Sequence, residues 1–258
     1  MKSISFDRGC FRLGIMCAMC VMLVPSLASA QHTAPHWSYG GHGGPNEWGE
    51  LDPSYAACSA GKLQSPIDIR GAKRADLPEL KFDYKPAPLN IIDNGHTIQV
   101  NYPAGSTLTV GDKTYTLKQF HFHHPSEEHV NGRDYDMVVH LVHADAEGHL
   151  AVVAVFWRNG NANELIDLVW KNIPKEKEKA VDVSGATVNA EELLPADRGY
   201  YTFAGSLTTP PCSEGVTWYV MKTPVSLSQA QLATFAKLYP HNARPIQAAN
   251  GREILASH

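Results

Sequence analysis

The chain has 258 residues, of which 43% are hydrophobic and 19% charged, so it is long enough to bury a sizeable core. Its formal net charge is −4, and this becomes −6 without residues 1–30, which hold three basic residues and one acidic residue. An acidic balance argues against a nucleic-acid-binding protein, because such proteins favour a basic face.

Residues 1–30 have the three parts of a secretory signal peptide. Basic residues precede an apolar run at residues 13–24, which is shorter than the ~20 residues that a membrane-spanning helix needs. An Ala-Ser-Ala site ends at Ala30, so we expect cleavage before Gln31 and a periplasmic protein with one domain over residues 31–258. An uncleaved membrane anchor is the alternative. We expect no membrane association after cleavage.

The predicted cleavage would leave two of the five cysteines, Cys58 and Cys212. Because cysteines of exported proteins commonly pair, we expect one disulfide bond. It would close a loop of about 150 residues and stabilise the fold by roughly 5 kcal/mol in the chain-entropy description. Two buried free thiols are the alternative. Neither cysteine lies in a CxxC pair, which argues against a dithiol redox site.

Residues 32–53 are rich in Gly, His, Trp and Pro and predict an irregular N-terminal arm. Further along the chain, short apolar or alternating runs are separated by turn signals, which is typical of antiparallel strands. The expected strands cover residues 90–92, 96–102, 107–110, 114–123, 135–143, 150–157 and 216–221.

Helical signals are fewer. A sequence from Asn161 to Glu164 resembles a capping box ahead of a first helix, and residues 228–238 predict a second helix, which Pro240 would end. Many strands and few helices indicate a mainly β (α+β) fold, with one large sheet and short peripheral helices in a single domain.

The segment QFHFHHPSEEHVNG, residues 119–132, concentrates four histidines and two glutamates. Alternate side chains of a strand share a face, so His121 and His123 point the same way and can hold one metal ion. The run DMVVHLVH adds His140 and His143, which face opposite ways, and strand parity alone does not choose between them. A pH switch and a histidine-rich surface tract are the alternatives to a metal site.

Three neutral imidazoles without a thiolate suit a catalytic zinc site with an open fourth position. Copper and nickel also accept imidazole ligands. A periplasmic zinc store built on His32, His36 and His42 is another reading, but these residues are irregularly spaced among Gly and Pro, which favours a solvated arm.

From about Trp37 to Ile254 the sequence resembles the α-class carbonic anhydrases, and most of all their exported bacterial members. The motifs that carry the resemblance, in the family's order and spacing, are SPIDI (65–69), NGH (94–96), QFHFHHPSE (119–127), HLVH (140–143) and SLTTPPC (206–212). The resemblance implies a large, twisted, mainly antiparallel sheet with zinc at the bottom of a conical cleft. It also implies the reversible hydration of carbon dioxide to bicarbonate and a proton.

The resemblance implies that His121, His123 and His140 hold Zn²⁺, and it leaves His124 and His143 as structural histidines. Zinc lowers the pKa of bound water from ~15.7 to about 7, so that zinc hydroxide would attack carbon dioxide at neutral pH.

The family match also implies the roles of three catalytic residues. Thr208 would lie beside the hydroxide and Glu127 would accept the threonine proton, so the pair would orient the nucleophile. His96 matches the family's proton shuttle, for which an ordinary imidazole pKa near 6.5 is suited. Cys58 and Cys212 match the disulfide of exported members. Because Cys212 follows Thr208 by four residues, we hypothesise that the bridge also holds the Thr208 loop in place.

Further positions match the walls of the family's cleft. The expected substrate-binding residues are Val142, Val152, Leu207, Thr209 and Trp218. The expected polar residues of the cleft are Tyr39, Asn94, Gln99 and Gln119. Sulfonamides and inorganic anions are the inhibitors that the family implies. The oligomeric state stays open, with a homodimer as one option.

The sequence departs from the family pattern beside the third ligand. Well-known members have a glutamate two residues before that histidine, where it accepts the second ring N–H; this chain has Val138, which cannot accept a hydrogen bond. Such partners matter for metal affinity. We hypothesise that Glu128, which replaces a histidine of the family, supplies the missing carboxylate.

A carbonic-anhydrase-like binding module without turnover is the competing class of function. Such a module is expected to lack a zinc-binding histidine, whereas this chain keeps His121, His123 and His140. Weak hydrolysis of activated esters is expected only as a side reaction.

Overall fold

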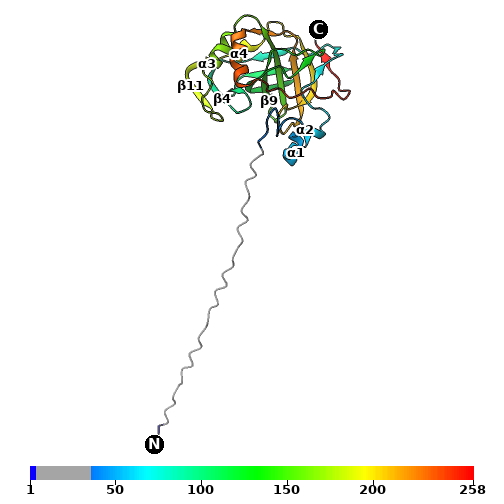
Figure 1. Cartoon of the computed structure of the whole chain (residues 1–258). Coiled ribbons are helices and arrows are strands. Elements are labelled where there is room, and N and C mark those ends of the chain that lie inside the picture. Colours follow the sequence, from blue (N-terminus) through cyan, green and yellow to red (C-terminus); the bar gives the residue numbers. More distant parts are fainter. Residues whose placement is uncertain (4–35) are drawn as a thin grey trace. The chain divides into compact units, whose positions relative to one another are not determined.

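The computed structural model describes residues 1–3 and 36–258, and a large mixed sheet organises the second range (Figure 1). The expected signal peptide, like His32 of the N-terminal arm, falls on residues 4–35 and so lies outside the described residues. The signal peptide therefore stays a prediction. Among the described residues, no helix is both long enough and apolar enough to cross a membrane.

Most of the strands lie in this one sheet. Their bounds are β1 (Asp68–Ile69), β2 (Lys73–Arg74), β3 (Leu80–Asp83), β4 (Ala87–Asp93), β5 (Ile98–Asn101), β6 (Thr107–Val110), β7 (Lys113–His123), β8 (His129–Val130), β9 (Met137–Ala144), β10 (Leu150–Asn159), β11 (Val181–Val188), β12 (Tyr200–Ser206), β13 (Glu214–Met221), β14 (Val225–Leu227) and β15 (Leu255–Ala256).

In the described part of the chain the main sheet has 13 strands, in the order β11-β4-β5-β7-β9-β10-β13-β12-β15-β2. Strand β14 pairs with β10, and β6 joins β3 to β7. Most neighbours are antiparallel, and the parallel pairs are β10 with β13, β10 with β14, and β15 with β2. Strands β1 and β8 form a separate parallel pair. The expected mainly β fold with one large, mainly antiparallel sheet is confirmed.

The helices are short and their starts follow from local capping. They are α1 (Trp48–Leu51), the 3₁₀ turn η1 (Pro53–Tyr55), α2 (Ala57–Ala60), α3 (Glu164–Lys171), the 3₁₀ turn η2 (Ala190–Leu193) and α4 (Gln229–Leu238). Helix α4 starts with a full capping box between Ser228 and Gln231, which confirms the second expected helix. Helix α3 is also confirmed, but its cap is Asn163 and not Asn161, because the Asn163 side chain accepts the Ile166 N–H at 3.0 Å.

Burial along the strands explains why the sheet has two different faces. In β4, Leu89 and Ile91 belong to the larger core cluster, so the residues between them point to the other face. In β9, Val139 and Leu141 join that same cluster, whereas Val138 belongs to a smaller one. One face of the sheet packs on the larger core cluster. The side chains at the alternate positions of these strands point to the other face, and the candidate site lies on that face.

The boundaries differ from the sequence expectation at one functionally important point. Strand β5 begins at Ile98 rather than at His96. The side-chain oxygen of Asn94 accepts the backbone N–H groups of His96 and Thr97 at 3.0 and 2.9 Å, and this turn delays the strand. His96 consequently lies at a turn on the rim of the sheet.

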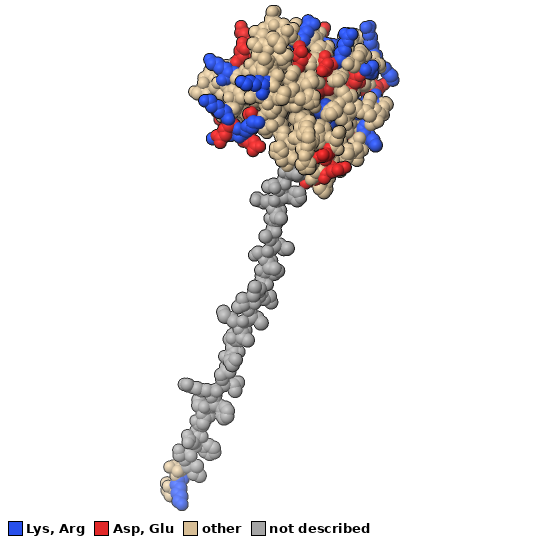
Figure 2. All heavy atoms as spheres, viewed as in Figure 1, with Lys and Arg blue, Asp and Glu red and all other residues tan. Residues whose placement is uncertain are grey.

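Acidic and basic side chains are intermingled on the face of the molecule that Figure 2 shows, with a broad uncharged area between them. The N-terminal arm is irregular from residue 36 up to α1, as expected. Trp48 anchors it, because its ring is fully buried and its indole N–H donates to the carbonyls of Ser38 and Gly43 at 2.9 and 3.1 Å.

Candidate metal centre

Three histidines converge where β7 and β9 run side by side. Strand β7 carries His121 and His123 on one face, and the antiparallel register sets His121 opposite His140 of β9. One ring nitrogen from each residue lies within 4.8 Å of the other two, in the one such group found among the described residues. His123 and His140 are each 1% exposed. The pair expected from strand parity is therefore joined by His140.

His143 and His124 lie elsewhere. His143 is buried on the opposite face, where one ring nitrogen lies 2.7 Å from the Tyr84 hydroxyl and the other lies 3.3 Å from the Ala151 carbonyl. His124 contacts the Asp136 carbonyl at 2.7 Å. The choice that strand parity left open is thus decided by which face of β9 packs on the larger core.

Each of the three converging imidazoles has one nitrogen already in use. His121 Nδ1 lies 2.8 Å from Gln119 Oε1, and His123 Nδ1 lies 2.7 Å from the Asn242 carbonyl. His140 Nε2 lies 3.2 Å from Glu128 Oε2. Oxygen acceptors require a proton on these nitrogens, so the lone pairs are on the other three: His121 Nε2, His123 Nε2 and His140 Nδ1.

The donor set fits a bound metal ion. His123 Nε2 is buried and has no hydrogen-bond partner, which is unusual unless a ligand uses its lone pair. Burial lowers the pKa of all three imidazoles, well below the ordinary value for His121, to about 4 for His123 and to about 3 for His140. They are therefore neutral at physiological pH, as metal ligation requires.

Glu127 lies beneath this cluster as a fully buried carboxylate. Its Oε1 accepts the Arg244 backbone N–H at 2.8 Å, and its Oε2 lies 3.6 Å from His123 Nε2. Burial raises its pKa to about 7, while the nearby His123 and hydrogen bonds from Arg244 and the Thr208 hydroxyl act in the opposite direction. A hydrogen bond from the Thr208 hydroxyl to the Glu127 carboxylate would leave the lone pairs of the threonine oxygen free.

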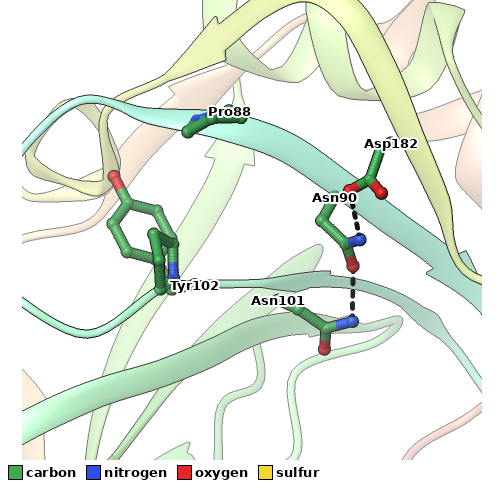
Figure 3. A pocket seen from close by; sticks show the side chains of 6 residues that line it. Pro88, Asn90, Asn101, Tyr102 and Asp182 are labelled. Carbon is green, nitrogen blue, oxygen red and sulfur yellow. Dashed lines mark hydrogen bonds between the residues drawn. The ribbon is translucent and has the colours of Figure 1, made fainter.

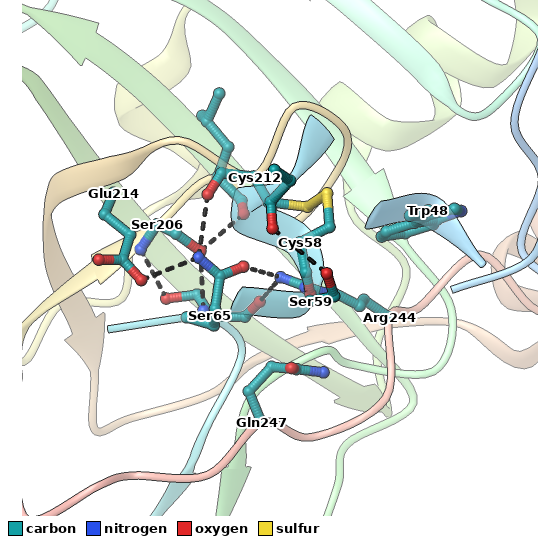
Figure 4. The surroundings of a disulfide bond; sticks show 12 residues. Trp48, Cys58, Ser59, Ser65, Ser206, Cys212, Glu214, Arg244 and Gln247 are labelled. Atoms are coloured by element: carbon teal, nitrogen blue, oxygen red, sulfur yellow. Dashed lines mark hydrogen bonds between the residues drawn. A yellow bond between two sulfur atoms is a disulfide. The ribbon is translucent and has the colours of Figure 1, made fainter. Parts of the chain in front are cut away.

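The expected disulfide between Cys58 and Cys212 is present (Figure 4). The Cys212 N–H donates to the Thr209 carbonyl at 2.8 Å, one residue after Thr208. On the other side, the Arg244 guanidinium donates to the Cys58 carbonyl at 2.9 Å. The bridge is thus linked toward Thr208 by a backbone hydrogen bond at Thr209, and toward Glu127 through Arg244, whose side chain reaches Cys58 and whose backbone N–H reaches Glu127.

Glu128 contacts His140, whereas Val138 has no group that accepts a hydrogen bond. Val138 is fully buried and lies opposite His123 in the register of β7 and β9. Glu128 is fully buried too, and it is the residue that contacts His140 Nε2. Burial raises the pKa of Glu128 to about 8, and its Oε1 has no hydrogen-bond partner.

An apolar row runs along the sheet beside the histidines. Register pairs Val142 with Val152 and Val152 with Trp218, so the three side chains lie next to one another across β9, β10 and β13. The Trp218 ring lies 4.9 Å from that of His140, between ring centroids. Leu207 packs on the same cluster. Four of the five expected substrate-binding residues therefore form one apolar wall; Thr209 lies on the adjoining loop.

Two of the polar residues expected in the cleft, Gln99 and Gln119, lie beside His121. Gln99 is opposite His121 in the register of β5 and β7, and Gln119 contacts the His121 ring as described above. Asn94 makes the turn that precedes His96.

His96 is half-buried under an aromatic residue that sequence reasoning missed. Trp37 stacks on its ring at 3.6 Å between centroids and an interplanar angle of 7°, and Tyr39 meets it edge-on at 6.4 Å. Burial, followed by the charge of His36, lowers the pKa of His96. A hollow of about 420 Å³ opens here, with His96 and His241 among its lining residues. Only the abundance of aromatic residues in the arm hinted at such a contact.

Comparison with known proteins agrees with this geometry. Residues 43–258 match a family model described as "Eukaryotic-type carbonic anhydrase". A carbonic anhydrase of Pectobacterium carotovorum is 42% identical over 239 residues, which is 92% of this chain and 98% of that protein.

Solved structures are similar over most of the chain. A hyperthermostable carbonic anhydrase from a hydrothermal vent chimney has 44% identity and a TM-score of 0.84, covering 86% of this chain and all of that one. The α-carbonic anhydrase of Thermovibrio ammonificans, in complex with the inhibitor sulfanilamide, has 43% identity and a TM-score of 0.82. That match covers 85% of this chain and 98% of the other.

Proposed function

Because this chain belongs to the α-class, or eukaryotic-type, carbonic anhydrase family, it is a carbonic anhydrase, and we propose that it works through Zn²⁺ held by His121, His123 and His140. The observation that carries the proposal is the convergence of three neutral imidazoles, two of them buried and one partly buried, whose free nitrogens lie within 4.8 Å of one another. An all-imidazole donor set of three suits zinc with one open position. When bound, zinc would lower the pKa of a water molecule to about 7 and so supply the nucleophile.

In this proposal Thr208 and Glu127 orient the reacting water. The Thr208 hydroxyl donates to Glu127, so its oxygen accepts the remaining proton of that water and directs a water lone pair at the substrate. Glu127 is itself held by the Arg244 backbone N–H. Substrate carbon dioxide is apolar, and the wall formed by Val142 and Trp218 offers it a surface without competing hydrogen bonds.

Each turnover also releases a proton, and we propose that His96 carries it to solvent. The half-buried position of its imidazole and the hollow beside it support this role, because a partly exposed ring can exchange a proton with bulk water. We propose that Glu128 orients His140 by accepting its Nε2–H. Sulfonamides and inorganic anions are the proposed inhibitors, by analogy with the sulfanilamide complex of the relative.

The disulfide and the bacterial relatives indicate an extracytoplasmic protein. We propose that residues 1–30 are the signal peptide and that the periplasm is the destination. We also propose that the Cys58–Cys212 bridge holds the Thr208 loop. Reduction of the folded protein should then lower turnover, and unchanged turnover in fully reduced, folded protein would refute that role.

The test of the proposed function is stopped-flow hydration of carbon dioxide together with metal analysis. We expect turnover that rises with zinc content and is lost in His140→Ala, while His143→Ala serves as the matched control and keeps its zinc. Stoichiometric zinc without turnover would instead support the binding-module alternative. Turnover retained by His140→Ala would overturn the ligand assignment.

A further inference from the structure

A row of side-chain amides crosses the sheet from its edge toward the histidine cluster. Register sets Asp182 of β11 opposite Asn90 of β4, and Asn90 opposite Asn101 of β5. Asn90 lies between the core residues Leu89 and Ile91, so its side chain points to the same face as the candidate site. Figure 3 shows Asp182, Asn90 and Asn101 in line, where they border a hollow of about 400 Å³ at the sheet edge.

Hydrogen bonds join these side chains into one chain with a single direction. Asn90 Nδ2 donates to Asp182 Oδ1 at 2.6 Å, and Asn101 Nδ2 donates to Asn90 Oδ1 at 2.7 Å (Figure 3). Gln99 Nε2 then donates to Asn101 Oδ1 at 2.7 Å, and Asn94 Nδ2 donates to Gln99 Oε1 at 3.5 Å. Every amide in the row therefore donates toward Asp182.

The direction of these hydrogen bonds follows from the carboxylate of Asp182, which ends the row. An amide has a donor and an acceptor side of nearly the same shape, so a free amide can turn round without a steric penalty. A carboxylate only accepts, so Asp182 requires the NH₂ side of Asn90, and this requirement passes to Asn101 and Gln99 in turn. The links on the Asp182 side are 2.6 to 2.7 Å, whereas Asn94 reaches Gln99 at only 3.5 Å. Asp182 therefore controls Gln99 more strongly than Asn94 does.

Gln99 is the residue of the row that lies beside the proposed metal ligand and contacts the turn of His96, so the orientation of its amide can affect the reaction. It lies opposite the proposed ligand His121 in the sheet register, and on its other side it contacts Asn94, whose turn carries His96. The side of its amide that faces the cleft decides whether nearby water meets a donor or an acceptor. Water between the nucleophile and His96 must be ordered in one direction to pass a proton outward.

We propose that Asp182, a residue at the sheet edge outside the reaction cleft, is a positioning residue that fixes the orientation of the Gln99 amide and thereby supports proton export. The inference rests on the proposed function in one respect only, the role of His96. The orientation of the amide row itself is independent of bound metal and of activity.

The test compares Asp182→Ala with Ser184→Ala, an exposed control on the same strand. In Asp182→Ala the side-chain amide NMR signals of Gln99 should shift or double, in metal-free and metal-loaded protein alike. The kcat for carbon dioxide hydration should fall about fivefold, the usual difference between a charged and a neutral hydrogen bond, while kcat/KM stays the same. Small imidazole buffers should restore kcat, because they replace the internal proton route.

A second variant separates orientation from simple loss of structure. Asn101→Asp places an acceptor-only group directly next to Gln99 in the row, so the double variant Asp182→Ala/Asn101→Asp should recover both the Gln99 signals and kcat. Unchanged Gln99 signals in Asp182→Ala, an equal fall in kcat and kcat/KM, or no recovery in the double variant would each overturn the proposal. If His96→Ala keeps full kcat, the shuttle assignment fails and the contribution of Asp182 to proton export fails with it, whereas the NMR signals still report the orientation of the Gln99 amide.

Discussion

Replacement of Glu128 by glutamine should weaken metal binding without weakening the metal-free fold. Glu128 Oε2 lies 3.2 Å from His140 Nε2, and both side chains are almost completely buried. The proton on His140 Nε2 leaves Nδ1 free for the metal, so the carboxylate selects the ligating form of the ring. Loss of such a partner typically costs 10- to 100-fold in metal affinity, which corresponds to about 1.4 to 2.7 kcal/mol.

Glu128→Gln should leave the stability of the metal-free protein unchanged or raise it. Glu128 Oε1 is buried without a hydrogen-bond partner, so the metal-free fold carries the cost of an incompletely paired carboxyl group. A glutamine of the same shape removes part of that cost. The thermal midpoint of metal-free Glu128→Gln should therefore equal or exceed that of the parent protein.

Competition with a chromogenic zinc chelator measures the affinity, and calorimetry of the metal-free protein measures stability. Glu128→Asp is the informative companion, because it keeps the carboxyl group but withdraws it by one methylene group from His140. Both variants should lose affinity if contact with the ring matters. Equal zinc affinity in the parent and Glu128→Gln would refute the reasoning, and so would a loss of affinity matched by a loss of metal-free stability.

Three further predictions concern other parts of the site. His140→Ala should bind no stoichiometric zinc by metal analysis, whereas His143→Ala should keep it and lose about 1 to 3 kcal/mol of unfolding free energy, because buried hydrogen-bond partners are left unpaired. Thr208→Val should fold normally and lower kcat/KM by about 100-fold in stopped-flow assays, because orientation of the reacting water is lost. Trp37→Ala should raise the pKa of His96 toward its ordinary value in an NMR titration, because burial disfavours the protonated ring and the substitution exposes it; an unchanged or lower pKa would contradict the stated cause.

Several elements of the fold were predictable because their signals are local. The capping box of α4 lies within four consecutive residues, and β6 has the bounds expected from its turn-flanked run. Strand β11 was not expected, because its sequence, VDVSGATV, mixes apolar and polar residues around Gly185 and its burial shows no clear alternation. It is an edge strand held by its pairing with β4, and that pairing joins segments about 90 residues apart.

In the candidate site, too, features that depend on local sequence were predictable, and features that depend on contacts between distant segments were not. Strand parity predicted that His121 and His123 share a face, whereas the partners of those rings came from distant segments. The Asn242 carbonyl that receives His123 Nδ1 lies 119 residues away, and no property of Asn242 in the sequence indicates the contact.

The chemical groups and their spacing along each strand could be read from the residues alone: the imidazole pair of β7, the Thr208 motif, the two cysteines and, through the family motifs, the reaction. The direction in which those strands face and the groups that support each ligand depend on the tertiary structure. It directs His140 rather than His143 to the site, and it brings Glu128 against His140. The physical reason is that alternation relates residues within a strand, whereas the inward face and the buried hydrogen-bond partners depend on packing between segments that are far apart in the chain.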